Sequence, residues 1–81
     1  MIADDVQARV AKAITPSVVS ARGDASRMEI NVVSSVFEGL SAVRKQQLVY
    51  AAIAELIGSG ALHAVTIRAS TPAENAAQPN G

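Results

Sequence analysis

The stretch Arg27-Met28-Glu29-Ile30-Asn31-Val32-Val33-Ser34, read together with Ala42–Ile57 and Ala64-Val65-Thr66-Ile67-Arg68-Ala69, decides the fold. Its first part alternates apolar and polar residues, as a half-buried strand does. The middle part repeats apolar residues at helical spacing, after Ser41 as a predicted N-cap, and Gly58 ends it. The last part again alternates apolar and polar residues, so it is predicted to be another strand. A strand, a helix and a strand in this order form a right-handed crossover, so the two strands should be parallel.

The residues before this stretch predict one helix and one more strand. Apolar residues repeat every four positions in 3–14, and Thr15-Pro16 ends that helix, because the residue before a proline resists the helical conformation. Residues 17–22 form a short strand candidate. The sequence Gly23-Asp24-Ala25-Ser26 has turn chemistry, so the two strands on either side of it should pair as an antiparallel hairpin.

These elements predict an α+β fold of order α-β-β-α-β. We expect a two-layer sandwich, in which a three-stranded mixed sheet carries both helices on one face and leaves the other face solvated. Residues 1–72 should form one domain, since 81 residues are too few for more. Residues 73–81 have the composition of a disordered C-terminal tail.

Composition excludes several classes of protein. Seven basic and seven acidic residues cancel, so the basic excess typical of proteins that bind nucleic acid through its phosphates is missing. Cysteine is absent, which excludes thiol catalysis, disulfides and cysteine-ligated zinc. No apolar run reaches the roughly 18 residues of a membrane span, and Asp4 and Asp5 stand where a signal peptide would be basic. We expect a soluble cytoplasmic protein that is not an enzyme, because no catalytic motif is visible.

His63 is the one histidine, and it lies between Gly58-Ser59-Gly60 and the last predicted strand. One interpretation is an ordinary strand-edge histidine capped by a backbone carbonyl. The other is a solvent-exposed metal ligand, because a neutral imidazole binds iron or copper.

Arg44 and Lys45 stand in the first turn of the longer predicted helix, where positive charge opposes the helix dipole. With the free N–H groups of that helix end they would form a small site for an anion or an acidic partner. The alternative is a solvated pair of cations balanced by Glu38.

Four short segments together resemble the BolA family, and most of all its IbaG-type branch. They are Phe37-Glu38-Gly39-Leu40-Ser41, Arg44-Lys45-Gln46-Gln47, Leu62-His63-Ala64-Val65 and Thr71-Pro72-Ala73-Glu74. The resemblance implies a fold similar to a type II KH domain. The Gly-x-x-Gly clamp with which KH domains hold RNA is missing from this chain.

The resemblance further implies an adaptor that pairs with a monothiol glutaredoxin in iron–sulfur cluster trafficking and in iron or stress regulation. His63 would be a ligand of a [2Fe-2S] cluster to which glutaredoxin adds a cysteine and glutathione another sulfur. The isolated chain would bind no cofactor. Arg27 stands where the family's second ligand is expected, and a guanidinium has no lone pair to give a metal. That leaves His63 alone, or His63 with an unusual oxygen ligand such as Asp24.

Two other classes of function stay open. A nucleic-acid-binding regulator would use the N-terminal end of the longer helix, through Arg44, Lys45, Arg27 and Arg68. Zero net charge and only two aromatic residues supply little for that role. A scaffold that binds neither metal nor nucleic acid is the third class. We expect a monomer or weak homodimer with no membrane partner.

Overall fold

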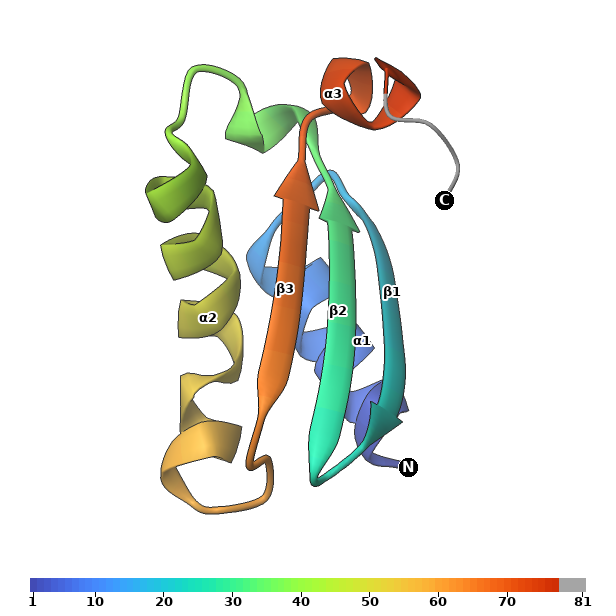
Figure 1. Cartoon of the computed structure of the whole chain (residues 1–81), viewed down its shortest axis with the longest axis vertical. Coiled ribbons are helices and arrows are strands. Elements are labelled where there is room, and N and C mark those ends of the chain that lie inside the picture. Colours follow the sequence, from blue (N-terminus) through green and yellow to red (C-terminus); the bar gives the residue numbers. More distant parts are fainter. Residues whose placement is uncertain (78–81) are drawn as a thin grey trace.

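Three strands form a mixed sheet in the order β1-β2-β3, in a computed structural model that describes residues 1–77 (Figure 1). β1 is Val18–Asp24 and pairs antiparallel with β2, which is Arg27–Val33. β3 is Val65–Ser70 and pairs parallel with β2. The predicted hairpin and the predicted parallel crossover are both confirmed. β1 reaches two residues further into the turn than we expected, whereas β2 begins at Arg27 as predicted, so that Ala25 and Ser26 alone connect the two strands.

Two long helices cover one face of this sheet (Figure 1). α1 is Ile2–Ala13 and packs mainly on β1, whereas α2 is Ala42–Gly58 and packs on β3. Ser41 caps α2 as predicted, because its hydroxyl accepts a hydrogen bond from the Arg44 N–H at 3.1 Å. The observed bounds lie within one residue of the predicted ones at both ends of both helices.

The alternation in β2 separates the two faces of the sheet. Met28, Ile30 and Val32 are fully buried, whereas Glu29, which lies between them, is exposed. The buried side chains of β2 meet those of both helices in one core, whose other members are Val6, Val10, Ile14, Phe37, Val49, Ile53, Leu56 and Leu62. The opposite face carries polar residues, and neither α1 nor α2 covers it, as predicted.

A short turn of 3-10 helix, η1, is Ser35–Phe37 and links β2 to α2. It begins where Ser34 accepts a hydrogen bond from the Val36 N–H at 3.0 Å. The ring of Phe37 is fully buried and belongs to the core.

The C-terminal segment differs from our expectation. The structure has a helix, α3, at Pro72–Ala77, so the prediction of disorder is wrong for residues 73–77. Residues 78–81 lie outside the described part of the chain. α3 begins with reciprocal hydrogen bonds: the Thr71 N–H donates to Glu74 Oε1 at 2.8 Å, and the Glu74 N–H donates to Thr71 Oγ1 at 3.1 Å. This capping box is the reason that so short a helix forms.

Candidate functional site

His63 lies at the end of the sheet where the β1–β2 turn is, directly before β3 (Figure 1). Its backbone N–H donates to the carbonyl of Ala25 in that turn at 2.8 Å, which fixes the position of its Cα. The residue is exposed. Within residues 1–77 neither ring nitrogen makes a hydrogen bond. The backbone of His63 is therefore held in place, and its imidazole faces solvent, as the ligand hypothesis requires.

The loop from α2 to His63 is ordered by its own hydrogen bonds. The Gly60 N–H donates to the Ile57 carbonyl at 3.1 Å, and the Leu62 N–H donates to the Leu56 carbonyl at 3.1 Å. Gly60 has a φ of 82°, the left-handed conformation that commonly ends a helix. Leu62 is buried in the core, so the chain next to His63 is anchored on that side too.

The β1–β2 turn beside His63 is organised by one carboxylate. Oδ1 of Asp24 accepts hydrogen bonds from the Ser26 hydroxyl at 2.7 Å, the Ser26 N–H at 3.0 Å and the Arg27 N–H at 3.2 Å. These bonds, that from the Ser26 hydroxyl above all, hold the pKa of Asp24 below its ordinary value. Asp24 therefore stays ionised, and Oδ2 carries none of these bonds.

The residues at this end of the sheet cannot form a metal site alone. Within residues 1–77 no three metal-ligating side chains of histidine, cysteine, aspartate or glutamate lie together. Arg27 lies at the start of β2 in the same turn and is exposed. The donors near this turn are the imidazole of His63 and the carboxylate of Asp24, so they fit only a metal group that a second molecule also ligates.

Arg44 and Lys45 lie at the other end of α2 and do not act as a pair. Lys45 is only 8% exposed, and its Nζ lies 2.7 and 2.9 Å from the two carboxylate oxygens of Glu74. The prediction of a pair of solvent-exposed cations is therefore wrong for Lys45, because its ammonium already binds a carboxylate of α3. Hydrogen bonds, that from Lys45 first, hold the pKa of Glu74 below its ordinary value. Arg44 is exposed and contacts Gln47 at 3.5 Å.

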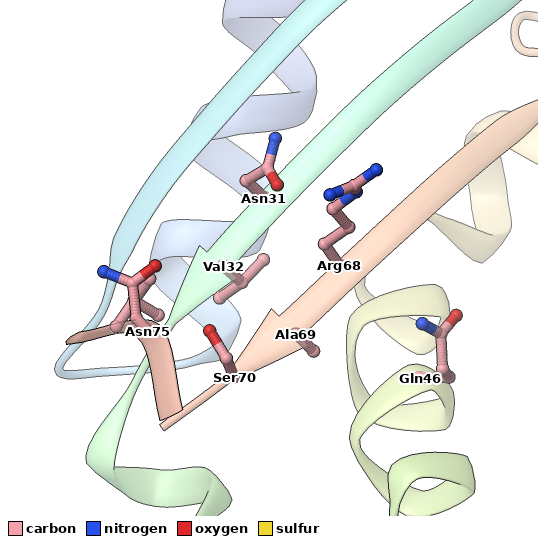
Figure 2. Close-up of a pocket in the computed structure, with 8 residues that line it drawn as sticks. Asn31, Val32, Gln46, Arg68, Ala69, Ser70 and Asn75 are labelled. Carbon is pink, nitrogen blue, oxygen red and sulfur yellow. The ribbon is translucent and has the colours of Figure 1, made fainter. Parts of the chain in front are cut away.

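Arg68 lies on the solvated face of the sheet, in the C-terminal half of β3, and borders a depression of about 390 Å³ (Figure 2). Asn31 is its partner in register on β2. Gln46 from α2 and Asn75 from α3 also border the depression. The sequence analysis named Arg68 but not these three amides, because only strand register and helix docking bring them to it.

The four cations proposed for an anion or nucleic-acid surface are thus dispersed. Arg27 lies at the hairpin end of the sheet, Arg44 at the start of α2 and Arg68 on the face of β3, while Lys45 is paired (Figure 1). No described helix is both long enough and apolar enough to cross a membrane.

Comparison with known proteins gives a consistent result. Residues 4–74 match the family model described as BolA-like protein. The chain is 38% identical over 71 residues to the acid stress protein IbaG of Escherichia coli K12, covering 88% of this chain and 84% of that protein. BolA1 from Arabidopsis thaliana has a TM-score of 0.80 at 27% identity, covering 95% of each chain. The BolA domain of SufE1 from the same plant has a TM-score of 0.79 at 26% identity, covering 90% of this chain and 94% of that domain.

Proposed function

We propose, because this chain belongs to the BolA-like protein family, that it is an adaptor which pairs with a monothiol glutaredoxin. In that pair it would share a [2Fe-2S] cluster and take part in cluster trafficking and in iron or stress regulation. The name of the similar IbaG, an acid stress protein, supports the stress part. The occurrence of a BolA domain in SufE1 supports a module that works beside another protein.

The observation that carries the proposal is the exposed imidazole of His63 on a fixed backbone. A ring nitrogen can bind iron that a second protein holds only if it is exposed and not engaged elsewhere. His63 meets both conditions among the described residues, and the hydrogen bond to Ala25 keeps the ring beside the β1–β2 turn. A ligand on a fixed backbone loses less conformational entropy when a partner brings the metal to it.

The donor set determines how such a cluster would be shared. A [2Fe-2S] cluster needs four protein or thiol ligands, and histidine replaces cysteine in some of them. This chain offers His63 and, as an unusual oxygen ligand, Asp24, so the partner and glutathione would have to supply sulfur. With one strong ligand on this side, we expect the cluster to remain mainly on the glutaredoxin.

The test is a titration of monothiol glutaredoxin, loaded with iron, sulfide and glutathione, with this protein, followed by circular dichroism in the visible region. Replacement of a sulfur ligand by His63 should change the spectrum, and His63→Ala should abolish the change. Thr66→Ala is the matched control, because Thr66 is exposed near the same end of β3 and should leave the change intact. A wild-type spectrum equal to that of glutaredoxin alone would contradict the proposal.

The alternative, a nucleic-acid-binding regulator, has less support. Lys45, at the start of α2, forms an ion pair with Glu74, so Arg44 is the one cation of the predicted pair that is exposed to solvent. A single phosphate contact gives weak binding that salt abolishes readily. Binding of duplex DNA at about 0.15 M salt that falls on Arg44→Ala would restore this alternative.

A further inference from the structure

The outer edge of β3 carries backbone groups that no neighbouring strand uses. β3 is an edge strand, and it bonds to β2 through alternate residues: Ala64 and Ser70 accept from the N–H groups of Met28 and Ser34. The residues between them, Val65, Ile67 and Ala69, therefore direct their N–H and C=O groups outward. An open row of this kind is a template for another extended chain.

Two depressions lie on either side of this edge near its C-terminal end. The first, of about 390 Å³, is bordered by Asn31, Arg68 and Asn75 on the solvated face (Figure 2). The second, of about 480 Å³, is bordered by Ala42 and Lys45 of α2 and by α3. Gln46, Ala69 and Ser70 border both. An extended chain directs successive side chains to opposite faces, so neighbouring residues of an added strand could enter the two depressions in turn.

The charge of the first depression selects an acidic occupant. Arg68 has no carboxylate within 4.0 Å among residues 1–77, where the ion pairs are Arg9 with Asp5, Arg9 with Glu55, and Lys45 with Glu74. The guanidinium can give two parallel hydrogen bonds to one carboxylate. The side-chain amides of Asn31 and Asn75 add further donors beside it.

From this arrangement we propose that an extended, acidic segment of a partner protein adds to β3 as a fourth strand. A carboxylate of the segment binds Arg68, and the adjoining residue places a small apolar side chain in the second depression. Strand addition of this kind takes affinity from main-chain hydrogen bonds and specificity from pockets for alternate side chains. We call the two depressions together the β3 groove. A nucleic acid fits it less well, because one arginine and no aromatic side chain border it.

Gln46 controls access to the edge. Its Nε2 donates to the carbonyl of Ile67 at 2.6 Å, and this carbonyl is one of the acceptors that an added strand would use. The side chain must turn away before a peptide N–H takes its place. Removal of this competing bond by Gln46→Ala should tighten peptide binding by about two- to tenfold.

The probe for the experiment is a blocked octapeptide of alternating valine and glutamate, titrated into the ¹⁵N-labelled protein and followed by NMR. We expect chemical-shift changes centred on residues 65–70 and on Gln46. Arg68→Gln should weaken binding by about ten- to a hundredfold, since it removes a charge-assisted bond. Arg22→Gln is the matched control, because Arg22 is exposed on the same face opposite Glu29 and should change little.

Two further peptides separate the parts of the proposal. An octapeptide of alternating valine and glutamine should bind the wild-type protein as weakly as the acidic peptide binds the Arg68→Gln protein. A peptide N-methylated at alternate residues, on the edge that would face β3, should not bind, because it cannot form the main-chain bonds. Equal affinity for the glutamine peptide would refute the carboxylate site, and equal affinity for the methylated peptide would refute strand addition. Shifts of the same residues by a single-stranded oligonucleotide, without any by the acidic peptide, would assign the groove to nucleic acid instead.

Discussion

Substitution of Gly23 by alanine should damage the end of the sheet that holds His63. Gly23 has a φ of 116°, a conformation that costs a residue with a side chain about 1–2 kcal/mol. An added Cβ would lie 2.2 Å from the carbonyl oxygen of Arg27, although Cβ atoms essentially never come within 3.0 Å of a neighbour. The two strands must therefore separate by nearly 1 Å at this point, which adds about 1–3 kcal/mol of strain.

The expected loss for Gly23→Ala is thus about 2–5 kcal/mol out of the 5–15 kcal/mol that a small domain has. Urea unfolding measures it directly. The strain acts on the turn whose Ala25 carbonyl accepts the His63 N–H, so the His63 amide should also exchange faster with solvent. Gly58→Ala is the matched control, because Gly58 is the last residue of α2 and nothing lies within 4 Å of its added Cβ. This substitution should leave the free energy of unfolding equal to that of wild type or slightly higher. A Gly23→Ala protein within 0.5 kcal/mol of wild type, with unchanged His63 exchange, would refute this account of the turn.

Three further outcomes are expected. The pKa of Glu74 lies below its ordinary value of 4.5, chiefly because Lys45 donates a hydrogen bond to its carboxylate. Ionised Glu74 therefore stabilises the fold above about pH 4.5, and this stabilisation is lost as the pH falls through the lowered pKa. The Tm of Glu74→Gln should therefore fall less than that of wild type when the pH is lowered from 6 to 3. Phe37→Ala should cost about 3–5 kcal/mol in urea unfolding, since the ring is fully buried. Arg27→His supplies an imidazole in the turn beside His63 and should lengthen the lifetime of a shared cluster, measured by its visible absorbance after addition of a chelator.

The order of elements could be predicted because local patterns decide it. Alternation in β2 and β3 and helical spacing in α1 and α2 reflect burial on one face, and the structure buries those faces in β2, α1 and α2 and half-buries that of β3. The place of His63 between a glycine loop and a strand left both interpretations of it open, and the structure shows the residue exposed. These features depend on residues close together in the chain.

The C-terminal helix was missed although its signal was present. Thr71 and Glu74 have the spacing of a capping box, but the composition of the last residues outweighed it. The error over Lys45 follows from that one. Its partner Glu74 lies 29 residues away on α3, so without the helix Lys45 looked like a free cation of the first turn. The position of Lys45 four residues before buried Val49 was the one local hint that it points inward.

The β3 groove could not be found from the sequence, for a different reason than the C-terminal helix. Asn31 and Arg68 meet only because β2 and β3 pair in one particular register, and Gln46 joins them only because α2 docks beside β3. A shift of one residue in that register would turn Asn31 to the buried face. Sites of this kind depend on contacts between distant segments, about which periodicity along the chain carries no information.

The two proposed sites lie at opposite ends of β3, with His63 just before its first residue and Arg68 near its last, and their separation bears on how an adaptor could work. From His63 to Arg68 is five residues, or about 17 Å of extended chain. This exceeds the screening length of about 8 Å at physiological salt, so the charge of a cluster at one end has little effect on Arg68 at the other. Substitutions so far apart with no shared partner have additive effects. His63→Ala should then leave peptide binding unchanged, and Arg68→Gln should leave the cluster spectrum unchanged. Each proposal can consequently fail alone, and a protein with both sites could hold a cluster-bearing partner and an acidic partner at the same time.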